Sequence, residues 1–167
     1  MKQYPKLPLL DQDGLHRIPL RFYALLVLLL RPYLCWIVTL VMPEAERKAV
    51  LSFFYPLSDD FIRAVLIAIP ALLVLAAVSQ RVPYDKKLRR GRAKTFWFGL
   101  WRQSRWLLLG VAAVDLYWTI SHLPPYVALR APGLLFVVAA LALSCLYLLR
   151  SQQLRLVFSE WPEDKKA

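Results

Sequence analysis

Residues 81–94 form the most basic segment of the chain, RVPYDKKLRRGRAK. The segment holds seven of the 22 lysines and arginines and only one acidic residue, and it lies between two long apolar stretches. So much charge cannot enter the hydrocarbon core of a bilayer, whereas the neighbouring stretches are too apolar to be exposed to water. The pattern predicts a cytoplasmic loop between two transmembrane helices of a polytopic membrane protein.

The overall composition agrees with this prediction. Of the 167 residues, 59% are hydrophobic, and the mean hydropathy is +0.45. The net charge of +11 would suggest nucleic-acid binding in a soluble protein. Here the basic residues flank apolar stretches, as they do where cytoplasmic loops face lipids. We therefore expect a bilayer with anionic headgroups as the partner, and no nucleic acid.

Four apolar stretches are long enough to cross a bilayer core of about 30 Å. They cover residues 22–42, 61–79, 100–120 and 132–149. We expect an all-α integral membrane protein in which residues 22–149 form a four-helix transmembrane domain. Residues 80–99 are expected to form its basic cytoplasmic loop.

The distribution of basic residues predicts the orientation. Four lysines and arginines lie in the N-terminal segment 1–21, nine lie between Arg81 and Arg105, and four lie in the tail 150–167. The loops 43–60 and 121–131 together hold three. Because cytoplasmic loops carry the excess of basic residues, the N-terminus, the central loop and the C-terminus are all expected in the cytoplasm.

Two ionisable residues lie deep in the predicted spans, Arg31 in the first and Asp115 in the third. Both spans run outward, and a rise of about 1.5 Å per residue puts each residue about 15–18 Å from the cytoplasmic end of its span. An unpaired charge at this depth costs at least about 2.5–3.5 kcal/mol on insertion scales. We expect an intramembrane ion pair that locks the two spans together; the alternative is a binding or proton-linked site.

Three smaller patterns concern the spans and their ends. Pro32 and Pro70 interrupt the first two spans and are expected to produce static kinks. Asp115, Trp118 and His122 fall on one face of the third span. In the loop 43–60, the aromatic residues 53–55 are expected to lie at the membrane interface.

The candidates for lipid headgroup contacts are the basic and aromatic residues at the start of the third span. Ordinary anchoring at the interface is expected rather than specific recognition. The candidates are Lys86, Lys87, Arg89, Arg90, Arg92, Lys94, Trp97, Trp101, Arg102 and Arg105.

The sequence contains none of the common catalytic signatures, such as a phosphate-binding glycine loop, His-Glu-x-x-His or Gly-x-Ser-x-Gly. Its two histidines, His16 and His122, are predicted to lie on opposite sides of the membrane. We therefore expect no enzyme, no cofactor and no metal site.

The order of several short motifs resembles the YfeZ-like family of small bacterial inner-membrane proteins. Tyr4 and residues 11–19, DQDGLHRIP, precede the first predicted span, and residues 30–33, LRPY, lie inside it. The segment 102–106, RQSRW, at the start of the third span adds to the match. The family has no assigned activity, so the resemblance implies a multi-pass protein of the bacterial inner membrane and adds no site residue.

Two functions remain open at this point. The expected one is a non-enzymatic accessory or interaction protein, which binds a membrane-protein partner or forms a homo-oligomer. The alternative is a small oligomeric transporter or channel that uses the Arg31–Asp115 pair.

Overall fold

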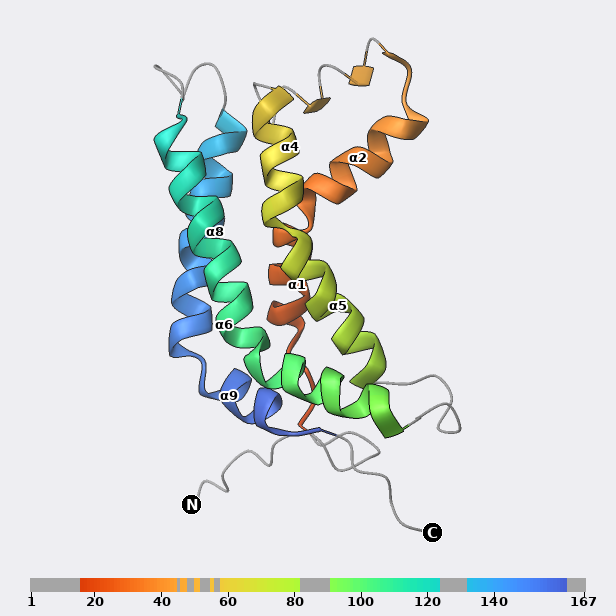
Figure 1. Cartoon of the computed structure of the whole chain (residues 1–167). Coiled ribbons are helices and arrows are strands. Elements are labelled where there is room, and N and C mark those ends of the chain that lie inside the picture. Colours follow the sequence, from red (N-terminus) through yellow and green to blue (C-terminus); the bar gives the residue numbers. More distant parts are fainter. Residues whose placement is uncertain are drawn as a thin grey trace, which may run out of the picture.

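The computed structural model of the chain describes residues 16–44, 46–47, 50–51, 55, 58–81, 91–123 and 132–161, and within these ranges it leaves out the side chains of residues 58, 81, 91–95 and 132. The elements of secondary structure in this part of the chain are helices (Figure 1). They are α1 (Leu20–Leu29), α2 (Arg31–Val41), α4 (Ser58–Ile67), α5 (Ile69–Arg81), α6 (Gly91–Ser121), α8 (Pro132–Arg150) and α9 (Gln152–Ser159).

The helices form a bundle with an apolar interior and an apolar outer surface. The interior is built by α1, α5, α6, α8 and α9 around residues such as Phe22, Val74 and Leu108. Large apolar side chains also point outward, among them Phe136 and Leu143 on α8. Such an extensive exposed apolar surface is typical of a protein that contacts lipid.

Within the described residues, two helical segments are long and apolar enough to cross a membrane. They are Asp59–Gln80, which joins α4 and α5, and Gly133–Arg150 in α8. A third crossing is added if α1 and α2 together form one bent span. The predicted third span, 100–120, lies within α6 but is not among these segments, because residues such as Arg105 and Asp115 lower its apolar character.

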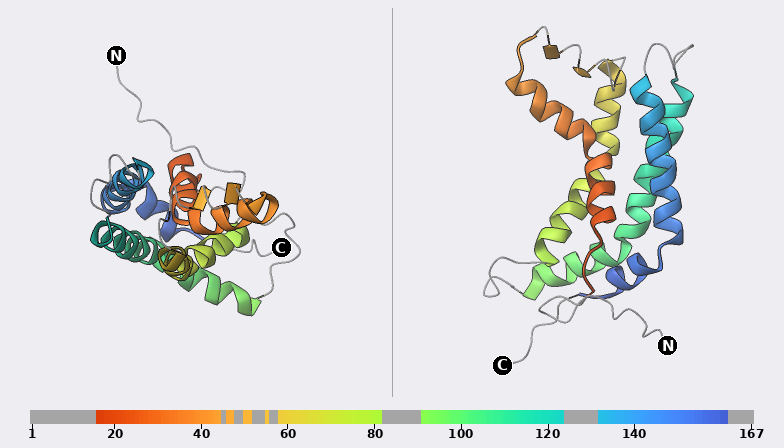
Figure 2. Two further views of the ribbon diagram at one scale, coloured as in Figure 1. Left: turned by 90° about the horizontal axis from the view of Figure 1, so that it is seen from above. Right: turned by 180° about the vertical axis from the view of Figure 1, so that it is seen from behind.

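The first predicted span, 22–42, is not one straight helix. α1 ends at Leu29, α2 begins at Arg31, and the two helices are bent by 64°. Pro32 cannot continue α1 because its ring would clash with the carbonyl group of Leu28, but it fits the first turn of a new helix. The expected kink is therefore a sharp bend, after which α2 diverges from the bundle (Figures 1 and 2).

The second predicted span is interrupted more mildly near Pro70. α4 ends at Ile67 and α5 begins at Ile69. Beside this break, the Tyr33 hydroxyl donates a hydrogen bond of 2.9 Å to the carbonyl oxygen of Val65. Neighbouring side chains commonly satisfy backbone groups at proline breaks in membrane helices. Tyr33 thus links α2 to the break between α4 and α5.

The predicted loop 80–99 is helical over its second half, because α6 begins at Gly91. Residues 82–90 lie outside the described part of the chain. Figure 1 shows the first turns of α6 running across the lower end of the bundle, below α5, before the helix rises beside α8. The basic and aromatic start of α6 therefore lies across the end of the bundle rather than in an extended loop.

The predicted tail, 150–167, contains α9, which packs against the bundle. Ser151 caps this helix by accepting a hydrogen bond from the backbone N–H of Leu154 at 3.3 Å. The ring of Phe158 lies 5.6 Å from that of Phe22 in α1 and 4.8 Å from that of Trp101 in α6. α9 is therefore part of the core and joins α1 to α6 through a layer of aromatic rings.

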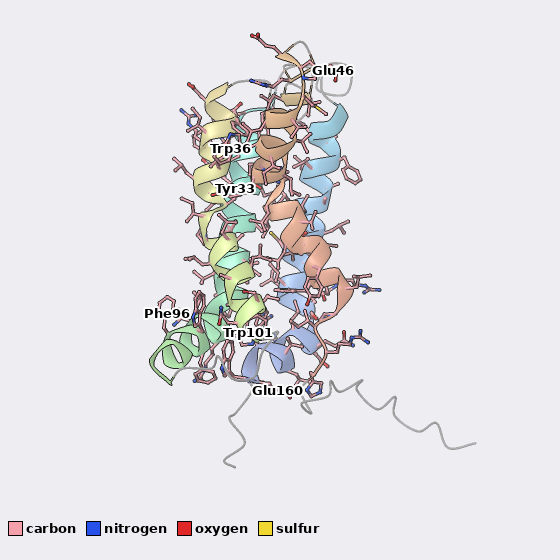
Figure 3. All side chains as sticks on the ribbon, turned by 90° about the vertical axis from the view of Figure 1, so that its right-hand side faces the viewer. Tyr33, Trp36, Glu46, Phe96, Trp101 and Glu160 are labelled. Carbon is pink, nitrogen blue, oxygen red and sulfur yellow. The ribbon has the colours of Figure 1, made fainter. Side chains whose placement is uncertain are left out.

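The two ends of the described chain meet in the same region. The backbone N–H of His16 donates to one carboxylate oxygen of Glu160 at 2.8 Å, and the imidazole Nδ1 contacts the other oxygen. Figure 3 shows Glu160 at the same end of the bundle as Trp101. The segment before α1 is therefore tied to the segment after α9.

Replacement of Trp101 tests the aromatic layer. Trp101 is fully buried, and its indole N–H donates to the Val157 carbonyl oxygen at 3.0 Å. We expect Trp101→Ala to lower the free energy of unfolding by about 3–5 kcal/mol, measured by thermal unfolding in mild detergent. Trp106→Ala is the matched control, because that ring is 64% exposed and its loss should change stability by about 0.5 kcal/mol or less. Equal losses would contradict the role of α9 and Trp101 in the core.

Candidate functional site

The structure brings Arg31 and Asp115 together in a two-pronged ion pair. Arg31 Nη1 donates to Asp115 Oδ2 at 2.8 Å, and Nη2 donates to Oδ1 at 3.0 Å. Their side chains are only 11% and 10% exposed. Parallel hydrogen bonds between a guanidinium and a carboxylate are among the strongest and most directional polar contacts in proteins. The pair therefore fixes the first turn of α2 against the last third of α6.

A small cavity of about 30 Å³ lies beside the ion pair. It is surrounded by residues of α2, α4, α6 and α8, together with Tyr55. The lining residues are Arg31, Tyr55, Asp60, Ala64, Ile67, Asp115, Trp118, Thr119, His122 and Leu134. A cavity of this size has room for one or two water molecules.

Tyr55 is buried beside the ion pair, so its side chain is not exposed to headgroups as the predicted aromatic belt requires. It is 7% exposed, and its ring centroid lies 5.9 Å from the guanidinium carbon of Arg31. Burial raises the pKa of its phenol, so the group stays protonated. The other two residues of the predicted aromatic belt, Phe53 and Phe54, lie outside the described residues. Sequence reasoning missed Tyr55 because only its hydroxyl distinguishes it from those neighbours.

The Trp118 ring, which lines the cavity, also contacts the side chains of His122 and Arg63. Its ring stacks on that of His122, with centroids 4.3 Å apart and an angle of 18° between the planes. The guanidinium carbon of Arg63 lies 4.7 Å from the centroid of the Trp118 ring, a cation–π distance. Asp115, Trp118 and His122 all line the cavity, as expected for residues on one helix face. The contact of Arg63 was missed because Arg63 belongs to another helix.

The candidates for lipid contacts at the start of α6 are divided by the structure. Lys86, Lys87, Arg89 and Arg90 lie outside the described residues, and the side chains of Arg92 and Lys94 are not described. Trp97 is half-buried, and Arg102 is exposed. Of the described candidates, Arg102 is thus the one whose charged side chain is exposed at the surface.

Two of the candidates for lipid contacts, Trp101 and Arg105, make contacts within the protein instead. Trp101 cannot contact headgroups, because it is fully buried in the aromatic layer. The Arg105 guanidinium donates to the carbonyl oxygens of Leu148 and Leu149, at 2.7 Å each, through Nε and Nη2. These carbonyl groups belong to the last turn of α8, where intrahelical partners are missing. Arg105 therefore caps α8.

Residues 6–160 match a protein family described as a protein of unknown function, DUF2919. The chain belongs to this family. The inner membrane protein YfeZ of Escherichia coli (strain K12) is 28% identical to it over 158 residues, which cover 92% of this chain and 93% of that protein. No solved structure matches the chain. The predicted resemblance to YfeZ-like proteins is confirmed, and the chain is a helical membrane protein of a family without an assigned activity.

A double-mutant cycle measures the coupling between Arg31 and Asp115. Arg31→Leu and Asp115→Leu should each lower the free energy of unfolding by about 3–5 kcal/mol, because each strands a buried charge. The double variant should recover part of the loss, measured by thermal unfolding in detergent. Arg102→Leu serves as the control: this exposed arginine lies 13 residues before Asp115 on α6, about 20 Å away along the helix, and should show no coupling to Asp115→Leu. Additive losses for Arg31 and Asp115 would mean that the two charges do not stabilise each other.

Proposed function

We propose that the chain crosses the bacterial inner membrane four times with both ends in the cytoplasm, and that it acts as a non-enzymatic accessory protein. Its partner is a transmembrane helix of another membrane protein. In this arrangement α1 and α2 form one bent crossing, α4 and α5 a second, α6 a third and α8 a fourth.

The crossing by α6 is supported by the placement of its charged residues. The first turns of α6 run across the end of the bundle (Figure 1). The predicted span, residues 100–120, is about 31 Å long, which matches the thickness of a bilayer core. Asp115 is paired with Arg31, and Arg105 is bound to the end of α8. The charges that lower the apolar character of α6 are thus neutralised or satisfied by hydrogen bonds, which reduces the cost of placing this helix in lipid.

The accessory function rests on the exposed apolar surface of α2. Only Pro32, Cys35 and Thr39 of this helix are buried. Six of its apolar side chains are between 43% and 86% exposed: Leu34, Trp36, Ile37, Val38, Leu40 and Val41. Because α2 turns away from its own bundle and carries no charge after Arg31, its surface suits an apolar helix of a second protein.

The geometry of the ion pair supports an accessory protein over the small transporter or channel. Both terminal nitrogens of Arg31 and both carboxylate oxygens of Asp115 are used in the pair. The adjoining cavity of about 30 Å³ has room for one or two water molecules.

Reporter insertions test the four crossings. Insertions after Lys48 and Pro125 should report the outer side, and insertions after Arg90 and Lys165 should report the cytoplasm, because the basic residues concentrate in the latter segments. Alkaline phosphatase and a cytoplasmic fluorescent protein provide the two opposite readouts. A cytoplasmic result at Lys48 would overturn the orientation, and one at Pro125 would remove α6 as a crossing.

Site-specific photo-crosslinking tests the partner surface. A photoreactive amino acid at Ile37 or Leu40 of α2 should give an adduct of one defined mass, because both side chains point away from the bundle. The matched control is Leu143 on α8, which is 66% exposed, as is Leu40. The protein in the adduct should be a membrane protein. When that protein is tagged and purified in mild detergent, without crosslinking, this chain should be purified with it. An adduct with a second copy of the chain, or equal labelling at Leu143, would contradict the proposal.

A further inference from the structure

We propose that the cavity beside the Arg31–Asp115 pair is a water-binding site, in which one or two water molecules are held by the Tyr55 hydroxyl and the Trp118 indole N–H. This proposal does not depend on the accessory function.

The first observation is that two buried donors lack partners. Trp118 Nε1 makes no hydrogen bond within the described part of the chain, and Tyr55 Oη has no partner at normal hydrogen-bond distance there; both atoms are shielded from the surface. The guanidinium of Arg31 lies near the Tyr55 hydroxyl and interacts with it, but a guanidinium can only donate, so the hydroxyl hydrogen of Tyr55 still lacks an acceptor. Tyr55 as a whole is only 7% exposed. Most buried polar atoms in proteins bond to protein or to ordered water, so two exceptions in one place require an explanation.

The second observation is that both residues line the same cavity. A hydroxyl group can also accept, but an indole N–H can only donate, so the missing group must be a hydrogen-bond acceptor. Water meets this requirement and can in turn donate its own hydrogens. The cavity wall offers carboxylate oxygens for them, from Asp60 and Asp115.

The third observation is the size of the cavity. A water molecule needs about 10–15 Å³ of such space and two to four polar partners. The volume of about 30 Å³ therefore accommodates one or two water molecules. A dry cavity would leave both donors unsatisfied in surroundings of low dielectric constant, where that cost is highest.

The surroundings also provide a route for exchange with bulk solvent. His122 is exposed and Asp60 is partly exposed, and both line the cavity together with the buried ion pair. Water can therefore enter from the end of the bundle that carries the start of α4 and the end of α6. The ion pair then contacts protein on one side and water in the cavity on the other.

Nuclear magnetic resonance on the full chain, labelled with ¹⁵N-tryptophan in detergent micelles, tests the site. The Nε1–H signal of Trp118, assigned with Trp118→Phe, should show a cross-peak to water. The signal of Trp101 is the internal control and should show none, because its N–H donates to the Val157 carbonyl oxygen. If Trp118→Phe does not fold, the signal is assigned by elimination with the other five Trp→Phe variants.

Tyr55→Phe provides a second measurement. If the hydroxyl holds water, its removal should weaken the water cross-peak of Trp118 and lower the Tm. If the hydroxyl is unsatisfied in a dry cavity, its removal should raise the Tm. Tyr33→Phe is the matched control and should lower the Tm, because that hydroxyl bonds to the Val65 carbonyl oxygen. Absence of the cross-peak in the wild type, or a higher Tm of Tyr55→Phe, would overturn the proposal.

Discussion

The two-pronged ion pair between Arg31 and Asp115 is the contact on which the arrangement of the helices depends. It lies where α1 gives way to α2, so it fixes the chain at the bend. Before the bend, α1 packs into the core; after it, α2 diverges and buries little of its surface. The hydrogen bond from Tyr33 to Val65 adds a second attachment in the same turn. The rest of α2 is free to face lipid or another protein because these two contacts hold its beginning.

The features that could be predicted from the sequence depend only on where a residue lies along the chain. Apolar stretches predict helices, and counting residues from the end of a span predicts depth. For this reason Arg31 and Asp115 could be matched as neighbours from their positions in the sequence alone. The size of the bend at Leu30 could not be predicted, because a proline fixes where a helix is interrupted but not the direction in which the chain continues.

The features that were missed depend on which side of a helix faces the bundle. Among the aromatic residues of α6, Trp101 belongs inside and Trp106 outside. A signal for this was present, since Trp101, Ser104, Leu108, Ala112 and Asp115 follow the three- and four-residue spacing of one helix face, and all are buried. The composition of segment 96–106 favoured an interfacial interpretation and concealed that spacing. Tyr55 had no comparable signal, because its position depends on contacts between segments.

The hydrogen-bonded contact between His16 and Glu160 affects the order in which the protein assembles during synthesis. These residues are separated by 144 positions in the chain, and Phe22 in α1 rests on Phe158 in α9. Of the described helices, α1 is the first to leave the ribosome, and it therefore receives a final neighbour from α9, the last of them to be made. Until then, Phe22 can contact Trp101 of α6 but lacks the ring of Phe158, so the bundle in the membrane is incomplete at this end. A chain that stops before α9 would lose contacts at its beginning as well as at its end.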